Sequence, residues 1–320
     1  MSDAYFTDSP FVSPLSDYGF KVTFGNQHNT LFLRRALQAL IGSAVPITAV
    51  SFEQTTFEGL TTDGRSGLYD LACTDAEGSH FLVEMQVSRY PEFLQRMKFY
   101  AFTKFNTLVR RGDFHFGNMP RIYCVGILVH SIFPGLPGYH QHLNLRNTEG
   151  VLLDQQLHFI TVELAKFDEA APIVTDLQKL LHLMKSLHKL RDVQDFPLFY
   201  REQWIREAIE ELDRTAMTAD ERMYLEMSIV REVAVLDGHR ADLAEALEEG
   251  KAKGLEEGKA KGLEEGQKKG LEVGKAEGKA EGERETIRLM LRNSSLSVEE
   301  IARYTGNTVA YVAAIKADLS

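Results

Sequence analysis

The sequence predicts an α/β fold in which a mixed central sheet is flanked by helices and followed by a C-terminal helical extension. Three observations predict it. Two segments, 67–75 and 79–87, flank a polar turn, and apolar and polar residues alternate along the second of them. This pattern is typical of a β-hairpin. A continuous apolar run at 122–129, within the segment 121–131, is typical of a strand covered on both faces. Between them, residues 91–112 have the apolar spacing of an amphipathic helix.

Before the hairpin, the sequence predicts a loose N-terminal segment, one helix and a first strand. Residues 1–13 are polar and we expect them to be loosely held. Apolar residues recur at helical spacing in 29–41, which predicts a helix, and Gly42 suits its C-terminal cap. Residues 45–53 predict a first strand and a linker.

The hairpin carries carboxylates within its strands, where acidic residues are depleted. A five-residue loop, Asp75–Ser79, would place Asp70 directly opposite Glu84. Glu84 and Gln86 share one face of the second strand because side chains alternate. The other face is apolar, with Phe81, Val83, Met85 and Val87.

Opposed residues in a hairpin lie about 5 Å apart, so the charges of Asp70 and Glu84 would repel unless a cation or a shared proton lay between them. Hard cations such as Mg²⁺ favour oxygen ligands of this kind. Two alternatives stand beside a metal site. The acids could line a solvated face, and a one-residue register slip would separate them onto opposite faces.

The predicted helix after the hairpin opens at Pro91, a favoured first position, and ends at Gly112. Its apolar stripe consists of Phe93, Met97, Tyr100, Ala101, Phe105 and Leu108. The window 86–125 is rich in basic residues, namely Arg89, Arg96, Lys98, Lys104, Arg110, Arg111 and Arg121, against Glu92 and Asp113. A carboxylate pair beside a cationic helix suits a phosphodiester substrate. A solvated helix face is the alternative.

The second half of the chain is predicted to be mainly helical. A further strand is expected at 157–164, and helices at 176–190 and 200–212, with Trp204 in the core. Thr218 and Glu221 form a capping box for the next helix.

Residues 247–282 form a charged repeat in which an octad begins at Leu247, Leu255 and Leu263 and glycine falls at every fourth position. The spacing of Glu249 and Lys253, repeated in later octads, favours helix by about 0.2–0.5 kcal/mol per pair. Each glycine costs about 1 kcal/mol. An isolated stable helix is therefore not expected. The repeat is interpreted either as a flexible linker or frayed helix, or as an assembly seam with a right-handed supercoil.

The tail resembles a helix-turn-helix. Ser297 and Glu300 form a capping box and Gly306 makes the turn. The second helix offers Tyr311 and Lys316 as the candidates for contact with DNA, so packing or protein contact is an equal alternative.

Composition excludes several classes of protein. The 320 residues carry a net charge of -10, which argues against general adhesion to nucleic acid but allows a local basic face. Cys73 and Cys124 do not form a disulfide framework, and no signal peptide or membrane span is predicted, so a cytoplasmic location is expected. His140 and His142 are interpreted as surface-loop residues rather than metal ligands.

Taken in order, several motifs resemble one bacterial family, the Rpn-type recombination-promoting nucleases and related transposases of the PD-(D/E)XK superfamily. They are Asp17-Tyr-Gly-Phe-Lys21, Asp70, Glu84-Met-Gln86, Arg96 with Tyr100, and the glycine-rich repeat. The resemblance covers roughly residues 14–165 and extends more loosely beyond. It implies a restriction-endonuclease-like core in which Asp70 and Glu84 bind Mg²⁺, with Mn²⁺ as a substitute.

The resemblance also implies roles for the other site residues. Gln86 stands where the superfamily usually has lysine, and an amide cannot supply a positive charge. Lys21 or Lys98 could take over the part of the missing lysine. Asp17 is a candidate further acid, or alternatively a helix cap. Substrate contacts are assigned to three residues, Arg96, Lys98 and Tyr100, of which Arg96 could instead pair with an acid and Tyr100 could simply pack.

The expected organisation is a nuclease-like domain at 1–165, a helical extension at 166–246, the repeat at 247–284 and the tail at 285–320. The expected activity is Mg²⁺-dependent DNA endonuclease cleavage connected with recombination or mobile elements. DNA is the expected partner, with homo-oligomers formed through the repeat. The alternative is a DNA-binding or scaffold protein on a catalytically weak nuclease fold.

Overall fold

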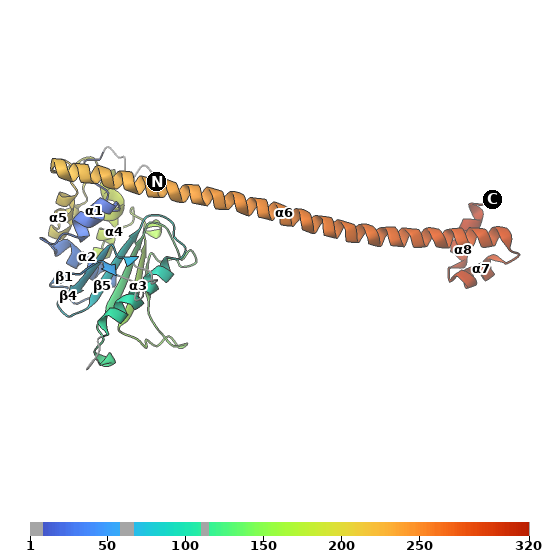
Figure 1. Ribbon diagram of the computed structural model, residues 1–320, viewed down its shortest axis with the longest axis horizontal. Helices are drawn as coiled ribbons and strands as arrows, with labels where there is room; N and C mark the ends of the chain where they lie inside the picture. Colours follow the sequence, from blue (N-terminus) through green and yellow to red (C-terminus); the bar gives the residue numbers. More distant parts are fainter. Residues whose placement is uncertain (1–8, 58–66, 110–114, 320) are drawn as a thin grey trace. The chain divides into compact units, whose positions relative to one another are not determined.

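The computed structural model describes residues 9–57, 67–109 and 115–319. The chain divides into two compact units, residues 1–238 and 239–320, which are described separately. Figure 1 shows the first unit as a layered α/β structure. Gly112, Arg110, Arg111 and Asp113, which were named in the predicted helix and basic window, lie outside the described residues.

The first unit is built on a six-stranded mixed sheet of order β1-β4-β5-β6-β8-β7. Its strands are β1 (Val50–Phe52), β4 (Leu71–Asp75), β5 (His80–Gln86), β6 (Ile122–Leu128), β7 (His140–Leu143) and β8 (Leu157–Glu163). The pairs β5–β6 and β6–β8 are parallel, and the other three are antiparallel. A separate two-stranded sheet joins β2 (Thr56–Phe57) and β3 (Gly67–Leu68). The predicted mixed α/β fold is therefore confirmed.

Helices cover both faces of the sheet (Figure 1). One face packs against α1 (Asp17–Phe24), α2 (Leu31–Ile41), α4 (Asp176–Ser186) and α5 (Gln203–Glu211). The other packs against α3 (Phe93–Leu108). Strand β6 supplies both cores, since Val125 and Ile127 face the first group and Cys124 and Leu128 face α3. This alternation explains its continuous apolar run.

Helix boundaries follow local chemistry. Gly42 ends α2 in the left-handed conformation, at φ 65°, as its position in the sequence predicted. Helix α3 begins at Phe93, two positions after Pro91 where it was predicted to open, and its predicted apolar stripe packs against the sheet. Trp204 is 4% exposed and stacks on Phe32, so its assignment to the core is confirmed.

Two predictions for the first unit were wrong. Residues 9–13 are not loose, because Phe11 and Val12 are buried and the Val12 N–H donates to the carbonyl of Leu212 at 2.8 Å. His140 and His142 do not lie in a loop, since both belong to the edge strand β7. A four-residue strand with two histidines lacks the apolar alternation on which strand prediction depends.

Helix α6 (Ala219–Asn293) contains the whole repeat and contributes to both units. The Thr218–Glu221 capping box precedes it as predicted, with the Thr218 N–H donating to Glu221 Oε2 at 2.7 Å. The repeat is helical along its length, which agrees with its interpretation as a frayed helix or as an assembly seam rather than as a non-helical linker. Apart from Gln267 and Val273, its other positions are Leu, Glu, Lys and Ala, which are strong helix formers, and a Cβ added at any of its glycines would meet no other group.

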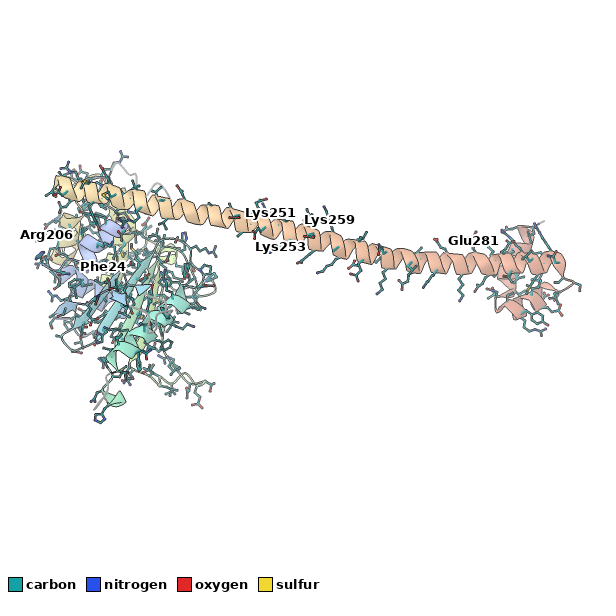
Figure 2. All side chains as sticks on the ribbon, in the orientation of Figure 1. Phe24, Arg206, Lys251, Lys253, Lys259 and Glu281 are labelled. Atoms are coloured by element: carbon teal, nitrogen blue, oxygen red, sulfur yellow. The ribbon has the colours of Figure 1, made fainter. Side chains whose placement is uncertain are left out.

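Side chains of the repeat point into solvent (Figure 2). The predicted pairing of Glu249 with Lys253 is not among the ion pairs of the described residues, where Lys251 contacts Glu248 instead, at 3.0 Å. Both side chains of that pair are more than 60% exposed, so it adds little to helix stability.

The second unit ends in a small helical cluster. The C-terminal turns of α6 pack with α7 (Val298–Thr305) and α8 (Val309–Ala317) around Ile287, Ile301, Val312 and Ile315. The predicted capping box of Ser297 and Glu300 forms, and Gly306 caps α7 at φ 72°.

Candidate active site

The first candidate residues lie on α1. Ser16 caps the helix by accepting the Gly19 N–H at 3.0 Å, so the cap role considered for Asp17 belongs to its neighbour. Asp17 instead pairs with Lys21 at 2.8 Å on the exposed side of the helix. A Cβ at Gly19 would lie 2.1 Å from the carbonyl oxygen of Ser13, so only glycine lets the preceding chain pass so closely.

The hairpin brings Asp70 and Glu84 together. Leu71 pairs with Val83 at the end of the ladder, with Asp70 immediately before β4 rather than within a strand as predicted. Asp70 and Glu84 are the next residues beyond that pair, and the charge and backbone of Asp70 both act on Glu84. The Met85 N–H donates to Asp70 Oδ2 at 2.7 Å and fixes that carboxylate. Glu84 is 13% exposed in its side chain, and its Oε2 atom is buried without a hydrogen-bond partner.

Burial and mutual repulsion disfavour the charged forms of these two carboxylates. Burial raises the pKa of Asp70, the Met85 N–H opposes this, and the neighbouring Asp17 charge raises the pKa again. Burial and then the charge of Asp70 raise the pKa of Glu84 to about 8, against the opposing effect of Arg96. Paired carboxylates with raised pKa values in a buried position are typical of a site that holds a cation or a shared proton.

Arg96 of α3 reaches across to the end of β5. Its Nη2 atom lies 2.8 Å from Glu84 Oε1 and donates to Gln86 Oε1 at 2.6 Å. The Gln86 amide nitrogen donates to the Ser88 hydroxyl at 2.8 Å, which fixes the orientation of the amide. The guanidinium also lies 5.0 Å from the centre of the Tyr90 ring. The structure thus contains the ion pair that was the alternative role of Arg96, and places its positive charge beside Gln86.

Tyr100 lies one helical turn after Arg96 and borders the same site. Its ring packs edge-on against Tyr69 at 4.9 Å, and the Tyr69 hydroxyl donates to the Tyr100 carbonyl at 3.2 Å. Burial, followed by the charge of Glu84, raises the pKa of Tyr100. Tyr100 therefore packs in the core, as the alternative allowed, and also lies within electrostatic reach of the acids.

Lys98 is placed differently from the other predicted residues. It is exposed, and two residues along a helix correspond to a rotation of roughly 200° away from Arg96. Within the described residues, no hydrogen bond or ion pair joins Lys98 to Asp70, Glu84 or Gln86. Lys21, by contrast, is among the charges that act on Asp70.

Among the described residues, the candidate metal ligands are the two carboxylates of Asp70 and Glu84 alone. Across the described segments, no group of three or more His, Cys, Asp and Glu side chains could hold a metal ion. His140 and His142 contact each other at 3.1 Å, and His140 also meets the Leu40 carbonyl at 2.8 Å. Asp17 therefore does not complete a three-residue cluster with Asp70 and Glu84.

Sequence reasoning missed three contributors: the Met85 N–H, Tyr69 and Gly126. Gly126 of β6 pairs with Glu84, and Phe93 of α3 packs directly over it. A glycine within a buried strand often marks a close approach by another element, and this signal was present in the sequence.

The Gly126→Ala variant should lose about 1–3 kcal/mol of unfolding free energy in chemical denaturation. The added Cβ would lie 2.4 Å from Phe93 Cε1 and 3.2 Å from Met97 Sδ, so α3 would have to move outward. Gly135→Ala is the matched control, because a Cβ there meets nothing within 4 Å. Equal stability of the two variants would contradict this account of the α3 contact.

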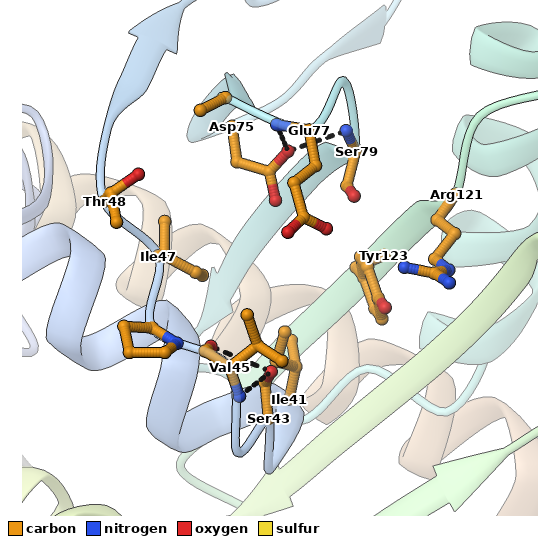
Figure 3. A pocket seen from close by; sticks show the side chains of 12 residues that line it. Ile41, Ser43, Val45, Ile47, Thr48, Asp75, Glu77, Ser79, Arg121 and Tyr123 are labelled. Carbon is orange, nitrogen blue, oxygen red and sulfur yellow. Dashed lines mark hydrogen bonds between the residues drawn. The ribbon is translucent and has the colours of Figure 1, made fainter.

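A cavity of about 310 Å³ lies elsewhere in the first unit (Figure 3). It is lined by Ile41, Ser43 and residues 45–48, by the hairpin turn, and by Arg121 and Tyr123. The turn is at one end of β4 and β5, whereas Asp70 and Glu84 lie at the other end. The cavity is therefore separate from the candidate site.

Comparison with known proteins identifies the class. Residues 14–237 match the family of PD-(D/E)XK nuclease family transposases. The chain belongs to this family, which confirms the resemblance seen in the sequence, and its sheet and helices form the restriction-endonuclease-like α/β core. No curated protein and no solved structure matches the chain.

None of the helices in the described ranges is both long enough and apolar enough to cross a bilayer.

Proposed function

We propose that this protein is a metal-dependent DNA endonuclease that hydrolyses phosphodiester bonds, with Mg²⁺ or Mn²⁺ held by Asp70 and Glu84. The observation that carries the proposal is the buried, unpartnered Oε2 of Glu84 beside a second buried carboxylate. Oxygen ligands of this kind fit a hard divalent cation. When bound, the cation supplies an activated water for in-line attack and stabilises the leaving oxygen.

The surrounding side chains would act on the substrate. Gln86 is held by Arg96 and Ser88 in an orientation suited to direct a water or a phosphate oxygen. Arg96 would contact the scissile phosphate as the positive charge that Gln86 lacks. Tyr100 would donate a hydrogen bond at the same edge of the site, since its raised pKa keeps its hydroxyl protonated.

The α1 residues would act from the other side. Lys21 is favoured over Lys98 for the role of the missing motif lysine, because its charge acts on Asp70. Asp17 would hold Lys21 in place through the ion pair at 2.8 Å rather than bind the metal. Lys98, which is exposed, is left as a contact for the DNA backbone.

The test is cleavage of supercoiled plasmid by the purified full chain with Mg²⁺, Mn²⁺ or EDTA. We expect nicked or linear product with either metal and none with EDTA. The description of the family as transposases supports a connection with mobile elements or recombination. No cleavage by well-folded protein with any divalent metal would overturn the endonuclease proposal.

A second function is favoured by Gln86 itself. An amide at this position supports a DNA-binding or scaffold protein on a catalytically weak fold. This function would give DNA affinity that falls steeply with salt but no strand breaks in the same assay.

The repeat is the candidate segment for self-assembly. Four leucines at eight-residue spacing are exposed, namely Leu247, Leu255, Leu263 and Leu271. Residues eight apart differ by about 80° around a helix, so a contact along all four requires helices that wind around each other in a right-handed sense.

Deleting residues 247–284 should therefore lower the molar mass measured by light scattering to that of a single chain. The physical reason is that the deletion removes the whole leucine and glycine seam. An unchanged multiple of the chain mass, or a monomeric full-length protein, would contradict assembly through the repeat.

A further inference from the structure

The outward face of α3 carries aromatic side chains that its amphipathic pattern does not require. The helix already buries Phe93, Met97 and Ala101 against the sheet. Phe99 and Phe102 are nevertheless 43% and 53% exposed. Residues three apart are neighbours on a helix surface, so Phe99 and Phe102 occupy adjacent positions on the exposed side of α3. We call these two residues together the α3 aromatic face.

The aromatic face is continuous with the candidate active site. Phe99 lies one turn after Arg96, and its ring centre is 6.2 Å from that of Tyr100. Tyr90, at 37% exposure, packs over Arg96 on the approach to the helix. Aromatic rings thus extend from the carboxylate pair onto the helix surface.

Charge on this face is entirely positive within the helix. The sequence of α3 contains no acidic residue. Lys98 is exposed next to Phe99 and one turn before Phe102, and Arg89 is exposed before the helix. Alternation of exposed rings with cations is the pattern that binds single-stranded nucleic acid, where bases stack on the rings and phosphates contact the cations.

We propose that the α3 aromatic face binds the unpaired bases of single-stranded DNA and presents the adjoining backbone to the carboxylate site. The inference rests on the proposed function, because the strand it holds is the substrate of that site. Bases in a duplex are stacked and paired with one another, so this face selects single strands and single-stranded ends or flaps. Lys98, which does not contact the carboxylates, gains a role here as a phosphate contact.

The experiment is fluorescence anisotropy in EDTA, with labelled oligothymidine and with a duplex of the same length. The Phe99→Ala and Phe102→Ala variants should each weaken oligothymidine binding by about 10-fold, and the double variant by more, with little change for the duplex. Leu198→Ala is the control, since Leu198 is 76% exposed on the same unit but away from α3. The proposal would be overturned if the wild-type chain did not bind oligothymidine, or if the two alanine variants bound it as well as wild type. It would also be overturned if the variants weakened duplex binding by the same factor.

A second variant removes any question of folding. Phe102→Trp preserves an aromatic ring at this position. Oligothymidine, but not duplex, should quench the fluorescence of the new indole. The native Trp204 is buried, so its fluorescence should not respond to either DNA. Because both measurements are made without divalent metal, they do not depend on cleavage. If wild type cleaves plasmid but shows no ring-dependent binding of oligothymidine, this inference alone is refuted. If it shows ring-dependent binding but no cleavage, only the endonuclease proposal is refuted.

Discussion

The Asp70→Ala variant is expected to lose Mg²⁺-dependent plasmid cleavage by about 10³-fold or more. Asp70 lies beside Glu84 at the end of the hairpin, and removing it leaves one carboxylate where two would bind the cation. Metal stabilisation of transition-state charge amounts to several kcal/mol, and each 1.4 kcal/mol is tenfold in rate. The measurement is the initial rate of nicking under identical Mg²⁺ conditions.

The same variant should remain folded. Alanine leaves the Met85 N–H without its acceptor, but it also removes a buried charge next to Glu84, and these effects oppose each other. Thermal unfolding in EDTA should therefore differ little from that of wild type. Glu77→Gln, an exposed acid in the turn of the same hairpin, is the matched control and should cleave normally. Metal-dependent cleavage retained by Asp70→Ala would rule out this site.

The second large effect concerns pH and metal binding at Glu84. Its pKa in the folded protein, about 8, lies above the ordinary value of 4.5. Between these values the unfolded chain has released the proton that the folded protein still holds. The contribution of Glu84 to the stability of the metal-free protein should therefore fall as pH rises from about 4.5 to about 8 and level off above that range, and it is measured as the difference in stability between wild type and Glu84→Gln at each pH.

Mg²⁺ should reverse this trend, because metal binding requires the deprotonated carboxylate and stabilises only the folded state. The increase in Tm on adding Mg²⁺ should be small near about pH 6 and largest above about pH 8. Glu84→Gln should remove the contribution of Glu84 to the pH slope and abolish the increase. An equal Mg²⁺ effect at both pH values, or its persistence in Glu84→Gln, would contradict the assignment of Glu84 as a ligand.

Patterns within short segments predicted much of the fold and of the candidate site. The proximity of Asp70 and Glu84 followed from loop length and strand alternation, both of which are local properties. The apolar run of β6 correctly indicated two covered faces. The glycine cap of α2 and the capping box of α7 were equally local and formed as predicted.

Features that depend on distant segments could not be predicted. Residues 9–13 are buried because they pair with the chain around Leu212, far away in sequence. The position of Gly126 under Phe93 and the reach of Arg96 to both Glu84 and Gln86 depend on how α3 crosses the sheet. Spacing within one segment carries no information about such crossings. Whether the repeat forms a helix could not be decided from local propensity, because its glycines oppose a helix while its assembly with other chains is not a local property.

The most direct test of the central claim is anomalous diffraction from crystals of the full chain soaked with Mn²⁺. The proposal predicts an anomalous peak within coordination distance of both the Asp70 and Glu84 carboxylates, with Glu84 Oε2 among the ligands. Arg96 should then contact Gln86 or solvent rather than Glu84. A well-ordered site with no peak between the two carboxylates, or a peak bound by other residues, would contradict the claim that this pair holds the catalytic metal.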